Sequence, residues 1–95
     1  MAYVFVNHKV ADYKPWKSTF DAFIETRRAG GEKSFDIFQP ENDPNNLFLM
    51  FEWDSLDHAR KFMSSEELKN TMKKAGVTEE PHIHFLKELG EPDVV

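Results

Sequence analysis

The chain has 95 residues, a formal net charge of −5 and no cysteine. Its length fits one small domain, and an acidic balance without a basic stripe argues against nucleic acid or an anionic membrane as a partner. The absence of cysteine excludes a disulfide framework, a thiol nucleophile and a thiolate metal site. Nine phenylalanines and an aromatic fraction of 14% predict a Phe-rich core, an aromatic-lined cavity, or both.

We expect neither a signal peptide nor a membrane span in this sequence. No apolar run approaches the ~18 residues of a membrane span, and residues 1–10 lack the basic stretch and apolar core of a signal peptide. We therefore expect a cytoplasmic protein with no membrane contact. We treat residues 1–95 as one domain and expect residues 90–95 to form a loose tail, or an arm that reaches a partner.

The first third of the chain predicts a strand and a helix. Residues 3–10 predict a strand, and its period of two places His8 on one face with Val4 and Val6, and Asn7 on the other. A helix capped by Asp12 follows and ends at Gly30. The apolar stripe of this helix, at helical spacing, consists of Tyr13, Trp16, Phe20, Phe23 and Ile24.

Two further strands follow this helix. Residues 33–39 predict a strand, and the turn-forming residues 40–46 join it to a third strand. Residues 47–53 are apolar on both sides, whereas a strand that covers only one core alternates with polar residues. Both faces of the third strand should therefore be covered.

The remainder of the chain predicts helix and then strand. A helix capped by Asp54 or Ser55 bends near Ser64, and a capping box from Ser64 to Glu67 would restart it. Residues 82–89 form the fourth strand. The order β-α-β-β-α-β predicts an α+β, ferredoxin-like sandwich with an antiparallel sheet.

Three segments resemble the dimeric α/β-barrel superfamily, close to its antibiotic biosynthesis monooxygenase-like and cyclase-like domains. They are NHKVADYKPWKSTFD (residues 7–21), FLMFEWDSLDHARKFMSS (residues 48–65) and PHIHFLKEL (residues 81–89). The resemblance implies a homodimer in which two sheets pack face to face into a barrel, which would cover the second face of the third strand. The superfamily includes cofactor-free oxygenases of aromatic polyketides, haem degraders, lactone isomerases and members without known activity, so the fold alone does not select a function.

The resemblance also bears on cofactors. Haem-degrading members use an Asn on the first strand, and a Trp and an iron-binding His in the region of the second helix. Asn7 matches the first position, but Phe62 and Met72 stand at the other two. We therefore expect no haem degradation and assign no cofactor.

We expect the chemistry-bearing residues to gather at one end of the sheet. This expectation takes strands one and three to run parallel, with the loop of residues 40–46 at the opposite end. His8 or His84 would act as a general base, because histidine titrates near neutral pH, and Asn7 would orient a carbonyl or dioxygen. The ligand contacts would come from Phe5, Trp16, Phe20, Glu52, Trp53 and His82.

Other interpretations of these residues stay open. His8, His82 and His84 could together bind a metal, but such spacing is weak support alone and we assign no metal. One candidate function is a small enzyme, a cofactor-independent monooxygenase or a cyclase/isomerase, that acts on a hydrophobic aromatic compound. The alternative is a non-catalytic dimeric module that binds a ligand or only assembles, with its histidines hydrogen-bonded at the sheet edge or the dimer interface.

Overall fold

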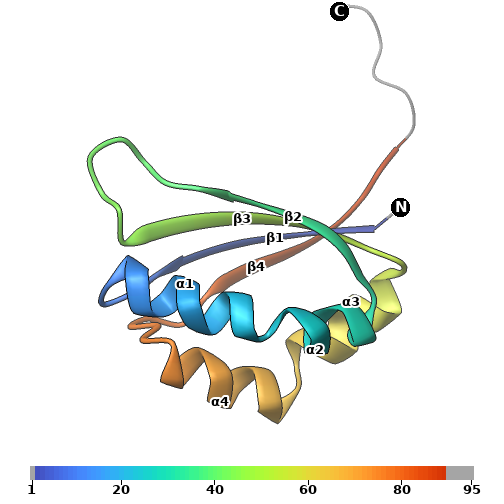
Figure 1. Ribbon diagram of the computed structural model, residues 1–95. Coiled ribbons are helices and arrows are strands. Elements are labelled where there is room, and N and C mark those ends of the chain that lie inside the picture. The colour runs from blue at the N-terminus through green and yellow to red at the C-terminus, as the bar shows by residue number, and fades with distance from the viewer. Residues whose placement is uncertain (1, 90–95) are drawn as a thin grey trace, which may run out of the picture.

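Four strands and four helices make up residues 2–89, the part of the chain that the computed structural model describes (Figure 1). The predicted order of elements is confirmed, including the break of the second helix near Ser64, and the fold is α+β and ferredoxin-like. The first predicted helix is also split into two, which the sequence pattern did not predict. The predicted tail, residues 90–95, lies outside the described residues. The elements are β1 (Ala2–Lys9), α1 (Tyr13–Ala22), α2 (Ile24–Gly30), β2 (Glu32–Phe38), β3 (Asn46–Trp53), α3 (Leu56–Met63), α4 (Glu66–Lys74) and β4 (His82–Lys87).

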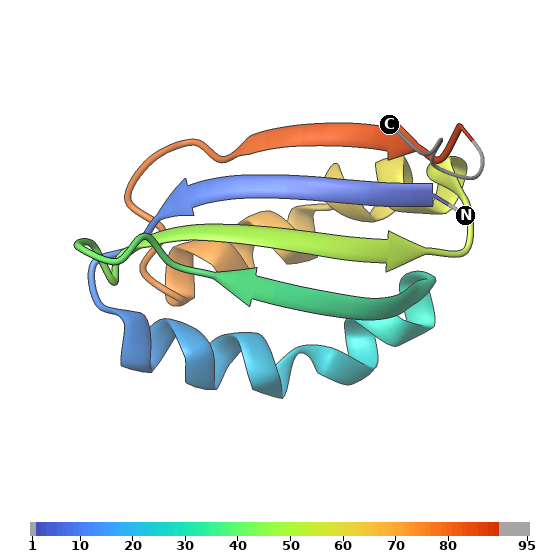
Figure 2. The ribbon, with the colours of Figure 1, turned by 90° about the horizontal axis from the view of Figure 1, so that it is seen from above.

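The sheet has the strand order β2-β3-β1-β4, and every neighbouring pair is antiparallel (Figure 2). The expectation that β1 and β3 run parallel is therefore wrong. The helices between β1 and β2 return the chain so that β2 runs parallel to β1, and the hairpin then reverses β3. As a result, the end of β1 meets the start of β3, and Lys9 pairs with Asn46 next to the loop of residues 40–46.

One face of the sheet packs against all four helices and forms the core (Figure 1). Buried and half-buried residues alternate along β1 and β3, because successive side chains of a strand point to opposite faces. Val4, Leu47, Leu49 and Trp53 are fully buried on this face. The aromatic residues of the helices complete this core, as their helical spacing predicts.

The other face of the sheet carries no helix (Figure 1). The third strand was expected to be covered on both sides, but within one chain only one side is covered: Phe38, on the uncovered side, is 56% exposed. We call this surface the open sheet face. The strand pairing places on it Tyr3, Phe5, Asn7, Phe38, Phe48, Met50, Glu52, His82, His84 and Leu86.

The helices are short, with seven to ten residues each. None in the described part of the chain is long and apolar enough to cross a membrane. The side chain of Asp12 makes no cap for α1; instead Asn45 Oδ1, from the loop after β2, accepts a 3.0 Å hydrogen bond from the Tyr13 N–H. Ser65, one residue after the predicted Ser64, caps α4. The loop of residues 40–46 therefore helps to position α1.

Truncation of Phe51 should remove a large part of the packing energy of this core. Phe51 is 5% exposed, so Phe51→Ala should lower the free energy of unfolding by about 3–5 kcal/mol. The matched change Phe38→Ala, on the open sheet face, should cost less than about 1 kcal/mol in the monomer. Urea denaturation followed by circular dichroism measures both. A cost below about 1 kcal/mol for Phe51→Ala would contradict the burial of this face.

Candidate functional site

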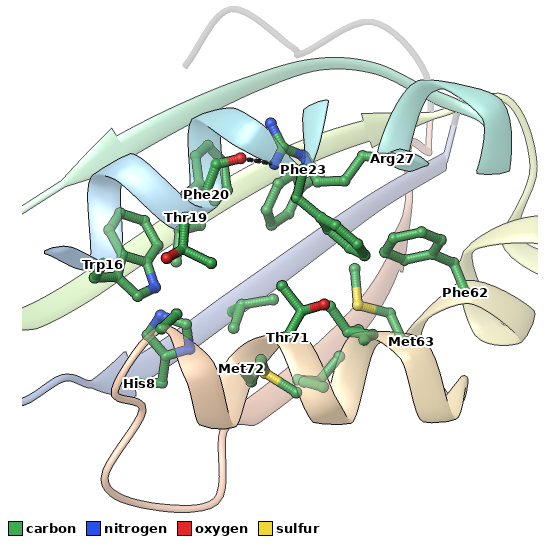
Figure 3. A pocket seen from close by; sticks show the side chains of 16 residues that line it. His8, Trp16, Thr19, Phe20, Phe23, Arg27, Phe62, Met63, Thr71 and Met72 are labelled. Atoms are coloured by element: carbon green, nitrogen blue, oxygen red, sulfur yellow. Dashed lines mark hydrogen bonds between the residues drawn. The ribbon is translucent and has the colours of Figure 1, made fainter. Parts of the chain in front are cut away.

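A cavity of about 70 Å³ lies between the covered face of the sheet and the helices (Figure 3). We call it the inner pocket. The helices on its two sides are α1 and α2 on one side and α3 and α4 on the other, and β1 and β3 form its floor. Its wall is almost entirely apolar, with aromatic side chains Trp16, Phe20, Phe23, Phe51 and Phe62.

Helical spacing brings the aromatic wall together. Trp16, Phe20 and Phe23 lie three and four residues apart, so they share one side of the helix. The rings of Trp16 and Phe20 stack with their centroids 4.9 Å apart, and Phe20 meets Phe51 of the sheet at 6.2 Å. An apolar pocket lined by flat rings suits a flat hydrophobic ligand.

His8 places an imidazole in the wall of this apolar pocket. It is 7% exposed, and neither of its ring nitrogens has a hydrogen-bond partner among residues 2–89. Its ring meets Trp16 edge-on, with the centroids 5.7 Å apart. Burial lowers the pKa of His8 from 6.5 to about 4, so the imidazole is neutral at physiological pH. It therefore offers one donor and one acceptor nitrogen, both without a partner.

Arg27 lies on the opposite side of the pocket from His8 (Figure 3). Its Nε donates a 2.7 Å hydrogen bond to Glu32 Oε1, with both side chains buried. Its Nη1 donates to the carbonyl oxygen of Phe20 in the last turn of α1, which also accepts a 3.2 Å hydrogen bond from the Phe23 N–H. Burial lowers the pKa of Arg27 and raises the pKa of Glu32, while the attraction between them opposes both shifts. The pair thus joins α2 to β2, and the Glu32 carboxylate neutralises the positive charge of Arg27 beside the pocket.

The predicted site residues divide between the two faces of the sheet. His8, Trp16 and Phe20 line the inner pocket. Asn7 and His84 lie on the open sheet face, because residues one apart on a strand point to opposite faces. The expectation that these residues form one cluster is therefore wrong. The open sheet face also carries the predicted ligand contacts Phe5, Glu52 and His82.

The ends of the strands also differ from the expectation. Trp53 pairs with Ala2, so Glu52 and Trp53 lie at the opposite end of the sheet from His8. The loop of residues 40–46 lies at the His8 end, where the Asn45 carbonyl accepts a 2.9 Å hydrogen bond from the backbone of Val10. The expectation that this loop is remote from His8 is wrong. Both corrections follow from the antiparallel direction of β1 and β3.

The residues on the open sheet face have contacts of their own. Asn7 Nδ2 donates hydrogen bonds to Asn46 Oδ1 at 2.9 Å and to the Leu47 carbonyl at 3.0 Å, so Asn7 holds the start of β3. The exposed ring of His84 lies 6.2 Å from that of Phe5, centroid to centroid. Roles for Asn7 and His84 in chemistry stay predictions. The sheet separates His8 from the other strand histidines, and within residues 2–89 no group of three or more acidic or histidine side chains could hold a metal ion.

Three polar residues of the inner pocket were not predicted from the sequence, namely Thr19, Thr71 and Arg27. Thr19 follows Trp16 by three residues, so the helical period could have placed it on the pocket side. Thr71 follows Leu68 by three residues, so the same period could have placed it beside the pocket, whereas a charge at the position of Arg27 is already accounted for by the helix dipole. Arg27 and Glu32 lie on different elements, and no local pattern predicts such a pair.

The low pKa of His8 makes stability depend on pH. Between about 4 and 6.5 the unfolded chain holds a proton on His8 that the folded chain does not. The free energy of unfolding should therefore fall as pH is lowered through this window, by up to about 3 kcal/mol from this group. Urea denaturation at several pH values should show this contribution in the wild type and in His82→Gln, an exposed control, and not in His8→Leu. Identical profiles for wild type and His8→Leu would contradict a buried neutral imidazole.

Comparison with solved structures supports the fold. A protein of Bordetella bronchiseptica assigned to the antibiotic biosynthesis monooxygenases has a TM-score of 0.75 at 15% identity, over 93% of this chain and 96% of that one. A Mycobacterium tuberculosis protein has a TM-score of 0.69 at 20% identity, over 97% and 98%. SnoaB from Streptomyces nogalater, a cofactor-independent oxygenase, has a TM-score of 0.69 at 17% identity, over 95% and 98%. At these identities the likeness concerns the fold alone.

The sequence itself gives the family. No curated protein matches the chain significantly. The family model described as antibiotic biosynthesis monooxygenase matches residues 14–74, which is more than half of the chain. This segment includes the helices on both sides of the inner pocket and the third strand that forms part of its floor. The chain therefore belongs to the antibiotic biosynthesis monooxygenase family.

Proposed function

We propose that this protein binds a small hydrophobic aromatic compound in the inner pocket and transforms it without a cofactor, with His8 as the proton acceptor. The observation that carries the proposal is the buried imidazole of His8, whose two nitrogens lack partners in the wall of an aromatic pocket. Buried polar groups without partners are rare because each costs about 1–3 kcal/mol. A ligand that hydrogen-bonds His8 would remove this cost.

The size of the pocket limits the ligand. Its volume of about 70 Å³ is well below the roughly 300–1,000 Å³ of pockets for drug-sized molecules. The pocket at rest therefore suits one ring, or one edge of a larger compound. Its nearly apolar wall favours a ligand with few polar groups. Any polar group of the ligand would contact His8 or the side of the pocket near Arg27.

A neutral imidazole can remove a proton from a carbon next to a carbonyl. The imidazolium and the enolate formed would attract each other strongly in a pocket that excludes water. In an isomerisation, the proton returns to another carbon. In a monooxygenation, the enolate passes electrons to dioxygen, a CH2 group becomes C=O, and the second oxygen atom leaves as water, so the substrate itself supplies the electrons. Family membership and the described activity of SnoaB favour the oxygenation.

We also propose that the protein is a homodimer whose open sheet faces pack together. The support is the group of Phe5, Phe48, Met50 and Leu86, which no element of the described chain covers. An aromatic surface of this kind is unfavourable on a monomer, and a second sheet would shield it by an isologous contact.

The dimer has a direct test. Light scattering at micromolar concentration should give twice the 11.1 kDa mass of the chain. Phe48→Asp should give monomers, because the contact would bury an unpaired carboxylate, while the exposed change Asp57→Asn on α3 should leave the dimer intact. A stable wild-type monomer would contradict the proposal.

The role of His8 can be tested through proton abstraction alone. Phenylacetone in D₂O should lose its α-proton NMR signals faster with the protein than without it. His8→Leu should lower this catalysed rate by at least about 10²-fold, whereas His84→Leu, the matched change on the open sheet face, should leave it unchanged. Loss of activity in His84→Leu alone would move the site to the open sheet face. Binding of the ketone without any catalysed exchange would favour the non-catalytic module.

A further inference from the structure

We propose that α4 is a hinged flap over the inner pocket and that it swings outward to admit a ligand. This inference rests on the proposed binding of a ligand in that pocket. It concerns how a ligand reaches the ring nitrogens of His8, which neighbouring atoms cover in the resting pocket.

The packing of α4 distinguishes it from the other helices. Trp16, Arg27 and Ala59 are buried residues of α1, α2 and α3, but no residue of α4 is buried. Its Thr71 hydroxyl bonds to the Glu67 carbonyl within the same helix, at 2.8 Å. Among residues 2–89, no side-chain hydrogen bond or ion pair joins α4 to the sheet or to α1. Only apolar contacts therefore hold its inner side.

The inner side of α4 borders the cavity. Leu68, Thr71 and Met72 line the inner pocket and are half-buried, and Figure 3 shows Thr71 and Met72 on the side opposite Trp16 and Thr19 of α1. Side chains next to free volume lose part of the dispersion energy that a filled core would supply. The cost of moving α4 is correspondingly low.

Both ends of α4 can act as hinges. Ser64 and Ser65 interrupt the helical path from α3, and Ser65 has extended backbone angles, with φ −73° and ψ 147°. At the other end Gly76 has a φ of +84°, a conformation that favours glycine. Just beyond it, the Thr78 N–H donates a 3.0 Å hydrogen bond to the Lys9 carbonyl, which anchors the chain to β1. The helix can thus pivot between two fixed points.

Ligand entry requires such a movement. Neighbouring atoms cover both ring nitrogens of His8, so a ligand can reach them only if a wall of the pocket shifts. The sheet is held by its strand ladders, α1 by buried Trp16 and α3 by buried Ala59. The wall that can shift at the lowest cost is α4.

Spin labels can measure the flap, because the chain has no native cysteine. Ser18→Cys on α1 with Asn70→Cys on α4 gives the α1–α4 distance, and Ser18→Cys with Asp57→Cys on α3 gives a matched control; all three positions are exposed. Pulsed electron resonance of the full chain should show a broader distribution for the α1–α4 pair than for the control. Saturating phenol should shift only the α1–α4 distances, to longer values. Leu68→Ala should produce the same shift without phenol.

The outcomes separate this inference from the proposed function. If phenol perturbs the NMR signals of His8 while the α1–α4 distribution stays as narrow as the control, the flap is wrong and ligand binding stands. If phenol does not bind, the proposed function fails. In that case a broad α1–α4 distribution in the free protein still supports the flap, and a narrow one overturns it.

Discussion

The alternation of side chains across a sheet that is covered on one face is the constraint on which the rest of this structure depends. Along β1 and β3 every second side chain enters the core, and the residues between them remain on a surface without helices. The core therefore combines the strand residues that point to the covered face with the aromatic stripe of α1 and the apolar residues of α3. The side chain of His8 points to the same face of the sheet as those of Val4 and Val6, so the same constraint buries an imidazole among apolar side chains.

Among residues 2–89, the core contains two sites with buried titratable side chains, the Arg27–Glu32 pair and His8. The two sites differ in their hydrogen-bond partners. Arg27 and Glu32 bind each other, and Arg27 also donates to the carbonyl of Phe20, so removal of either partner would leave an unpaired buried charge. His8 has no hydrogen-bond partner within residues 2–89, and the fold bears this cost at a site that borders a cavity. A structural role explains the ion pair, which still leaves the buried Nη2 of Arg27 without a hydrogen-bond partner within residues 2–89. The unpartnered imidazole is better explained by a ligand, and this difference directs the assignment of function to the inner pocket.

Local patterns in the sequence predicted most of the fold. Short-range patterns predicted the first strand, the stripe from Trp16 to Phe23 and the turn of residues 40–46, and each was confirmed. The site was predicted only in part, because its composition depends on strand direction. If β1 and β3 were parallel, as the sequence led us to expect, Glu52 and Trp53 would lie beside His8. The antiparallel pairing puts them at the far end of the sheet. Asn7 was grouped with His8 although strand geometry separates them. Arg27 and Glu32 meet through tertiary packing, for which the sequence carries no periodic signal.

A crystal structure of the protein with phenol diffused into it would test most directly whether the inner pocket is the functional site. Our account predicts one phenol between the helices and the sheet, in contact with His8 and Trp16, with its hydroxyl hydrogen-bonded to a ring nitrogen of His8. Phenol bound only on the open sheet face beside His84, with the inner pocket closed by its own side chains, would contradict it.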